Sequence, residues 1–152
     1  MSRYILLFLF LLQLIPGQKI LIPMDMSQKD HLKAYGVTFM VLTKNINVEW
    51  LLNYRGGSFL VDSYQFIAQE CRIRGVTFEE LLGNEILPIY GAIDKNNMEV
   101  ILLEKAPKIA IYTPPNKQPW DDAVTLALAY AEVPYKSLWD EEVFTGELEN
   151  ID

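Results

Sequence analysis

KILIPMDMSQKDHLKAYGVTFMVLTKNINVEWLL, residues 19–52, is the stretch on which the fold prediction rests. Residues 19–23 form a short apolar run closed by a proline, which is typical of a buried strand. Ser27 or Asp30 can cap a helix that follows. Apolar side chains then recur at spacings of three and four, on one face of that helix: Leu32, Tyr35, Phe39 and Leu42. Residues 48–52, VEWLL, are predicted to form a second strand, so the stretch predicts a strand, a helix and a strand.

The rest of the chain continues this alternation. After a turn at residues 53–57, further strands are predicted at 58–61, 76–78, 100–103, 108–112 and 135–139. The predicted helices cover 64–71, capped by Gly75, then run from Pro88 to Ile93, and finally begin at Pro119 with Asp121 and Asp122 in the first turn. Most strands are apolar throughout, which favours a parallel sheet covered on both faces. The predicted class is α/β, a Rossmann- or flavodoxin-like parallel sheet flanked by helices.

The chain divides into three predicted parts: a signal peptide at 1–17, an N-terminal α/β domain at 18–105 and the start of a second α/β unit at 106–152. The unit that begins at Lys108 contains one β-α-β before the sequence stops. A lone unit of this kind has open sheet edges and too little core. It either adds to the preceding sheet or belongs to a truncated fold, and we expect truncation.

The first seventeen residues have the pattern of an export signal. Arg3 precedes an apolar run that ends at Pro16-Gly17. This run is shorter than the ~20 residues that a membrane-spanning helix needs. The alternative is an uncleaved anchor. In both cases we expect the rest of the chain to be exported, as a periplasmic or secreted protein. If the signal is cleaved, we expect no stable membrane span to remain.

Charge and residue counts exclude several functions. The chain has 13 Lys and Arg against 20 Asp and Glu, a net charge of −7. This balance argues against nucleic-acid binding, which needs basic residues to displace phosphate counterions. His31 and Cys71 are the single histidine and cysteine, so no metal site is predicted, and no cofactor is expected. Cys71 is interpreted as a small buried hydrophobe rather than a nucleophile, and His31 as a partly exposed polar residue.

Candidate binding residues follow from the predicted sheet. Ligands of doubly wound sheets lie beyond the carboxyl ends of strands, which here are the loops at 23–25, 53–58 and 113–117. The loops supply five weak candidates for ligand binding: Asp25, Arg55, Gly56, Gly57 and Asn116. Arg55 beside two glycines can hold an anion, although a plain tight turn explains the same residues. Asp25 is either a ligand contact or a helix cap. The loops match no dinucleotide or phosphate-loop motif, and no catalytic residue is assigned.

Four stretches together carry a resemblance to a known family: LIPMDMSQKDHLKAYGVTFMVL, NVEWLLNYRGGSFLVD, ECRIRGVTFEEL and APKIAIYTPPNKQPWDDAVTLALAYAEVPY. They resemble the N-terminal portion of exported bacterial proteins named asparagine synthetase B, over nearly all of residues 19–148. The resemblance implies a class I glutamine-amidotransferase-like α/β fold, a longer chain, and an amidotransferase-like unit from Lys108.

The catalytic residues that this family name implies are not found in the sequence. Such a synthetase needs a cysteine directly after the initiator methionine, where this chain has Ser2 in the export signal, and no Ser-Gly-Gly-type pyrophosphate loop is present. Three functions therefore stay open. The first is an exported protein that binds a small or peptide-like ligand at strand ends. The second is a glutamine-dependent amide-transfer or amide-hydrolysing enzyme with catalytic residues beyond Asp152. The third is a non-catalytic assembly module.

Overall fold

The computed structural model describes residues 18–117 and 122–152. The predicted signal peptide at 1–17, and Pro119, Trp120 and Asp121 of the predicted helix start, lie outside the described residues. The strands are β1 (Lys19–Ile22), β2 (Val48–Leu52), β3 (Ser58–Asp62), β4 (Glu79–Leu81), β5 (Glu99–Leu103), β6 (Ala110–Tyr112) and β7 (Lys136–Leu138). The helices are α1 (His31–Thr43), α2 (Gln65–Arg74), α3 (Gly83–Lys95), α4 (Ala123–Ala131) and α5 (Asp140–Phe144), with short 3-10 turns η1 (Tyr54–Gly56) and η3 (Glu147–Asn150).

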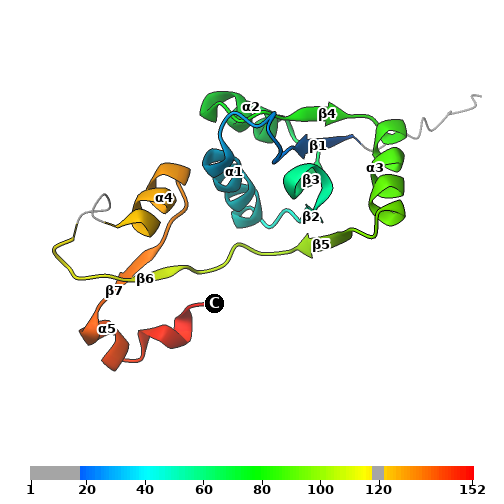
Figure 1. The fold of residues 1–152 in the computed structure, drawn as a ribbon. Coiled ribbons are helices and arrows are strands. Elements are labelled where there is room, and N and C mark those ends of the chain that lie inside the picture. Colours follow the sequence, from blue (N-terminus) through cyan, green and yellow to red (C-terminus); the bar gives the residue numbers. More distant parts are fainter. Residues whose placement is uncertain (1–17, 118–121) are drawn as a thin grey trace, which may run out of the picture.

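The first five strands form one sheet in the order β4-β1-β3-β2-β5 (Figure 1). Every neighbouring pair in this sheet is antiparallel. The predicted Rossmann- or flavodoxin-like parallel sheet is therefore wrong. Because β1 and β2 are both antiparallel to the β3 strand between them, they run in the same direction. The loops that follow them therefore lie at the same end of the strands.

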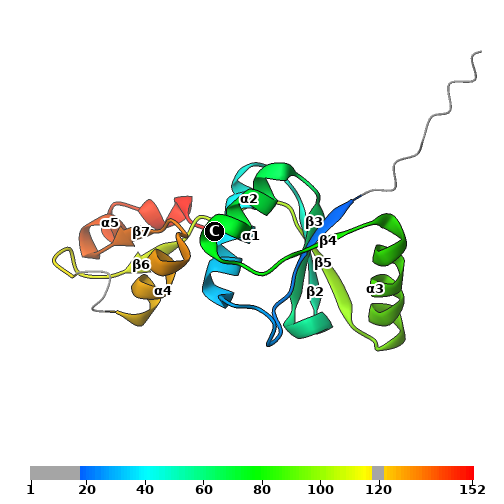
Figure 2. The ribbon, with the colours of Figure 1, turned by 90° about the horizontal axis from the view of Figure 1, so that it is seen from above.

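The strands are apolar throughout for a reason other than the predicted parallel pairing. In β1, Ile20 and Ile22 pack with α1 and α2, whereas Leu21 packs on the opposite face with α3. Both faces are thus covered by helices, and Figure 2 shows α3 on the side away from α1 and α2. A continuous apolar strand indicates that both faces are buried. It does not indicate the direction of the neighbouring strand, and here the neighbours are antiparallel.

A tight hairpin joins β2 to β3, and β3 lies between β1 and β2 in the sheet. In the connection from β2 to β3, Asn53, Arg55, Gly56 and Gly57 all have positive φ angles, of 63°, 46°, 81° and 92°. A Cβ atom on Gly56 would overlap the carbonyl group of Met24, so this position needs glycine both for its backbone angle and for its space. The turn predicted at 53–57 is confirmed, and it reverses the chain into an antiparallel pair.

Two element boundaries differ from the prediction. The strand expected at 76–78 lies three residues later, at β4, where Lys19 pairs with Leu81. The helix expected to start at Pro88 starts at Gly83 and contains Pro88. Proline removes one hydrogen bond from a helix, but Pro88 and the preceding turn at Asn84 are exposed, so water can hydrate the carbonyl group that loses its donor.

The second unit is a β-α-β arrangement in which β6 and β7 form a parallel pair. This pair does not join the five-stranded sheet, so the unit does not extend that sheet. It contacts the first unit through α4, which packs on α1. Gly36 of α1 makes this close approach possible, since a Cβ atom there would overlap the carbonyl oxygen of Ala131. Across residues 18–117 and 122–152, no helix has the length and apolarity needed to cross a membrane.

Candidate functional site

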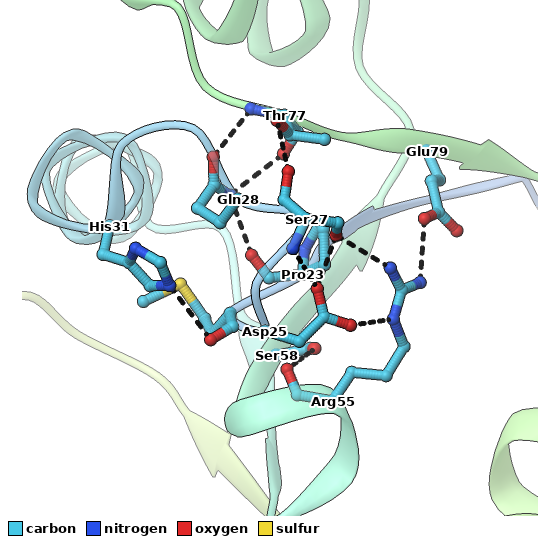
Figure 3. Close-up of polar contacts among 10 residues, drawn as sticks. Pro23, Asp25, Ser27, Gln28, His31, Arg55, Ser58, Thr77 and Glu79 are labelled. Atoms are coloured by element: carbon cyan, nitrogen blue, oxygen red, sulfur yellow. Dashed lines mark hydrogen bonds and ion pairs between the residues drawn. The ribbon is translucent and has the colours of Figure 1, made fainter.

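The loops after β1 and β2 bring Asp25 and Arg55 together (Figure 3). The Nε atom of Arg55 donates to Oδ2 of Asp25 at 2.7 Å, and its Nη1 atom donates to Oε1 of Glu79 at 2.8 Å. The Nη2 atom donates to Oγ of Ser27 at 3.2 Å. We call Asp25, Arg55 and Glu79 the ion-pair cluster. Two of the loops that were proposed as candidate binding loops therefore lie in contact, although the sheet is antiparallel.

The electrostatics of the cluster favour the charged forms of Asp25 and Arg55. The hydrogen bond from Arg55, with further donation from the hydroxyl and backbone N–H of Ser27, holds the pKa of Asp25 well below its ordinary value. The hydrogen bond to Asp25, with a second to Glu79, raises the pKa of Arg55 against the opposing effect of burial. One guanidinium group faces two carboxylates, so its positive charge is already compensated within the protein.

A side-chain bridge fixes the loop that carries Asp25. Gln28 is buried, and its Nε2 atom donates to the carbonyl oxygens of Pro23 and Thr77 at 2.8 and 3.2 Å. Its Oε1 atom accepts from the backbone N–H of Thr77 at 2.8 Å. The Nε2 atom of His31 lies 3.1 Å from the carbonyl oxygen of Met24. These contacts give the loop a structural role, and Asp30 rather than Asp25 caps α1.

The other three predicted site residues have separate surroundings. The Gly57 backbone N–H donates to Tyr54 at 3.1 Å, and its carbonyl oxygen accepts from Nε1 of Trp50 at 3.0 Å. Both backbone polar groups of Gly57 are therefore hydrogen-bonded within the hairpin. Gly56 makes close contact with the backbone of Met24. Asn116 is exposed in the loop after β6, in the second unit. The five predicted residues thus do not form one site.

Cys71 has the surroundings of a core residue. Its side chain is fully buried, and burial raises the pKa of its thiol to about 12. Both neighbouring arginines are paired with carboxylates: Arg72 with Glu80 at 3.1 Å and Arg74 with Glu70 at 3.0 Å. A thiol in this environment stays protonated at neutral pH, and it is the thiolate that reacts. This agrees with its interpretation as a small buried hydrophobe.

Sequence reasoning missed a second polar network, on the α3 face of the sheet. Glu49 of β2 accepts hydrogen bonds from Lys19 of β1 and from the hydroxyl of Tyr90 on α3. Lys19 also lies 3.4 Å from Asp62. Burial, followed by the contact with Glu49, raises the pKa of Tyr90. Glu49 alternates with apolar residues in its strand, so a polar position in β2 was visible, but its partners come from distant elements.

The feature that most resembles a ligand site is a cleft of about 370 Å³ between the two units. We call it the apolar cleft. It is bounded by α1, β2, β3, β5, the connection to β6, and α4 with the residues after it. Its lining is mostly aromatic and aliphatic: Tyr35, Thr38, Phe39, Leu42, Trp50, Phe59, Leu103, Lys105, Pro107, Ile109, Leu128 and Val133.

Aromatic rings form one wall of the apolar cleft. The Phe59 ring packs edge-on against Tyr35 at 5.7 Å and stacks with Trp50 at 6.3 Å between centroids. Polar groups in the lining are mostly occupied: the Thr38 hydroxyl donates to the Ala34 carbonyl at 3.0 Å, and Nζ of Lys105 lies 2.7 Å from Asp152. An apolar surface of this kind suits a ligand that brings no charge.

A second cavity, of about 520 Å³, continues from the first and shares Phe39, Pro107 and Ile109 with it. The sequence could not reveal either cavity, because each needs residues of the connection and the second unit to lie on α1. Phe39 and Leu42 were predicted only as one apolar face of a helix. Nothing in that periodicity distinguishes a face that is fully packed from one that borders a cleft.

Metal binding finds no support among residues 18–117 and 122–152, where no three His, Cys, Asp or Glu side chains gather in a way that could hold an ion. Comparison of the chain with protein-family models, with curated proteins and with solved structures finds no match.

Proposed function

We propose that this protein is an exported, non-catalytic binding protein whose ligand is a small, uncharged and largely apolar molecule held in the apolar cleft. The observation that carries the proposal is the cleft itself, with its volume of about 370 Å³ and its aromatic wall. Cavities of roughly 300–1,000 Å³ are the usual size of small-molecule sites. The exported compartment rests on the signal-peptide pattern of residues 1–17.

The cleft is a better place for the ligand than the strand-end loops. An anion bound at Arg55 would compete with Asp25 and Glu79, whose carboxylates lie 2.7 and 2.8 Å from the guanidinium. It would also add negative charge beside two carboxylates. An apolar molecule in the cleft displaces water from apolar surface without breaking an ion pair, and this transfer is favourable by about 25 cal/mol per Å².

The resemblance to proteins named asparagine synthetase B remains part of the proposal, as a statement of relationship. Its implied amide chemistry has no support among the described residues. The single cysteine, Cys71, is buried and has a raised pKa. Incubation of the full chain with glutamine should therefore release no ammonia above the buffer control. Ammonia release that scales with protein concentration would favour the enzyme instead.

A fluorescent probe tests the binding proposal. N-phenyl-1-naphthylamine is uncharged and apolar, and its emission rises when it leaves water. We expect the full chain to bind it, and Ile109→Asp to weaken binding about tenfold, because a carboxylate in the lining must be desolvated when the probe enters. Ile109 lines the cleft and is partly buried.

The matched control is Val124→Asp, which makes the same kind of change on an exposed residue in the first turn of α4. An acidic residue is well tolerated at a helix N-terminus, so this variant should bind the probe as the parent does. Equal binding by all three proteins, or no binding by the parent, would contradict the proposal.

A further inference from the structure

The second cavity has a more polar lining than the apolar cleft that it continues. Its volume is about 520 Å³, and it lies where the connection to β6, the start of β7 and residues 150–151 approach the C-terminal end of α1. Phe39, Pro107 and Ile109 line both cavities, so one elongated molecule can occupy the two together. Five polar side chains lie in the lining of the second cavity: Thr43, Lys108, Tyr135, Lys136 and Asn150.

Three of these side chains make no hydrogen bond or salt bridge with any of residues 18–117 and 122–152. They are the ammonium group of Lys108, the hydroxyl of Tyr135 and the amide of Asn150. Lys108 comes from the connection before β6, Tyr135 directly precedes β7, and Asn150 belongs to η3. Each of the three can donate a hydrogen bond. Small-molecule sites combine an apolar lining with a few polar groups of this kind.

The other polar groups of this cavity are occupied. Nζ of Lys136 forms an ion pair with Glu147, and the Thr43 hydroxyl donates to a carbonyl oxygen of its own helix at 2.6 Å. The backbone N–H of Lys108 donates to Oδ2 of Asp152 at 2.9 Å. The cavity therefore offers a ligand mainly hydrogen-bond donors, and the Lys108 side chain can only donate.

The charge around this cavity disfavours an anionic group. Residues 106–152 contain three lysines against nine aspartates and glutamates, so the second unit has a net negative charge. Glu147 and Asp152 contact the two lysines of the lining. An anion would be attracted to Lys108 but repelled by the surrounding field, whereas an uncharged oxygen gains the hydrogen bonds without that repulsion. A carbonyl oxygen is a group of this kind.

We infer that the ligand has two parts: an apolar chain in the apolar cleft, and an uncharged oxygen-containing head group that accepts hydrogen bonds from Lys108 and Tyr135 in the second cavity. This inference rests on the proposed function and names its ligand class, which is long-chain ketones and esters. Lys108 is exposed and Tyr135 is partly buried, so the head group stays in contact with water. The chain supplies most of the affinity, and the head group fixes the orientation.

Two isomeric ketones test the inference, because they differ only in the position of the oxygen. The carbonyl group lies near one end of 2-undecanone and at the middle of 6-undecanone. Each is used to displace N-phenyl-1-naphthylamine from the full chain. We expect 2-undecanone to bind about threefold to tenfold more tightly, since a central carbonyl must enter the apolar cleft without a hydrogen-bond donor. Equal affinities would overturn the inference.

Lys108→Met and Tyr135→Phe each remove one donor and keep most of the side chain. Each should weaken the binding of 2-undecanone about threefold, the size expected of one hydrogen bond, and leave 6-undecanone and the probe unchanged. Lys117→Met is the matched control, because Lys117 is an exposed lysine of the second unit that lines neither cavity. It should bind all three molecules as the parent does. If Lys108→Met and Tyr135→Phe also bind 2-undecanone like the parent, the head-group site is wrong.

The probe separates this inference from the proposed function on which it rests. A parent that binds neither the probe nor a ketone contradicts both. A parent that binds the probe and does not distinguish the two ketones contradicts the head-group inference alone. Undecanoate gives the remaining outcome: if it binds more tightly than 2-undecanone and loses that advantage in Lys108→Met, the head group is a carboxylate and the inference of an uncharged one is overturned.

Discussion

Residues 18–105 and residues 106–152 form two units that differ in how much of their apolar surface is buried. The first has a buried cluster on each face of its sheet, together more than twenty residues. The second has two strands of three residues each, and many of its large apolar side chains are exposed: Tyr112, Val124, Leu126, Tyr130, Phe144 and Leu148. The first unit thus has a core of its own, whereas the second depends on its contact with the first.

That contact is narrow and specific. Gly36 allows α4 to approach α1, and Glu132 at the end of α4 adopts a positive φ of 60°. Its carboxylate lies 2.6 Å from Lys33 and 3.1 Å from Arg74. A residue other than glycine pays a conformational cost for a left-handed angle, and here the two ion pairs offset it. The apolar cleft exists only while this contact holds.

The largest expected effect is that of Gly36→Ala. The new methyl group overlaps the Ala131 carbonyl group, so α4 must move away, at a cost of about 1–3 kcal/mol for an overpacked contact. Hydrogen exchange should become faster in α4 while β1 and β3 stay protected. Probe binding in the cleft should fall with it.

Gly91→Ala is the matched control. Gly91 lies in α3, and a Cβ atom there meets nothing within 4 Å. Alanine is the better helix former, so this variant should gain about 0.5–1 kcal/mol. If Gly36→Ala instead behaves like Gly91→Ala, the close approach of α4 to α1 is wrong.

Arg55→Met separates the ion-pair cluster from the cleft. The change removes the partner of Asp25 and Glu79, so the thermal midpoint should fall by about 2–4 °C, the shift expected for about 1 kcal/mol in a chain of this size. Probe binding should be unchanged, because Arg55 does not line the cleft. Loss of probe binding without loss of stability would place the ligand at the strand ends.

Acid should act on the same cluster. Because the folded-state pKa of Asp25 is lowered, its contribution to stability is complete above the unfolded pKa of about 3.9 and is lost as the pH falls through the lower folded value. The loss of stability below about pH 4 should therefore be smaller in Arg55→Met than in the parent. Identical acid profiles, measured by urea unfolding at each pH, would contradict the role given to this pair.

The smallest expected effect is that of Glu132→Gln, which keeps the side chain's shape and removes its charge. The hydrogen bond from Lys33 lowers the pKa of Glu132, so the carboxylate is charged at neutral pH. Its pairs are partly exposed, and about 0.5 kcal/mol is expected for such contacts. Added salt should weaken the docking of α4 in the parent and have less effect in the variant.

Local signals in the sequence predicted much of the chain. The Asp30 cap, the Gly75 helix end and the turn at 53–57 are each found. Each depends on a few neighbouring residues, such as the positive φ of 71° that glycine adopts at Gly75. The β-α-β unit after Lys108 is also found, as the parallel pair of β6 and β7.

The sheet direction was wrong because one pattern has two causes. Ile20, Leu21 and Ile22 are all apolar since α1, α2 and α3 cover both faces, and a parallel sheet gives the same pattern. The signal that distinguished them was the five-residue connection with Gly56-Gly57 between two apolar runs, which favours a hairpin. The apolar cleft had no such local signal, because its lining comes from five separate elements and their connections.

The central claim, that the apolar cleft rather than the strand-end loops holds the ligand, is tested most directly by NMR. The full chain, labelled with ¹⁵N, is titrated with N-phenyl-1-naphthylamine, and the amide shifts are followed. We predict the largest changes at Tyr35, Phe39 and Leu128, with the amides of Asp25 and Arg55 unmoved. The largest changes at Asp25 and Arg55, or none at the cleft, would contradict it.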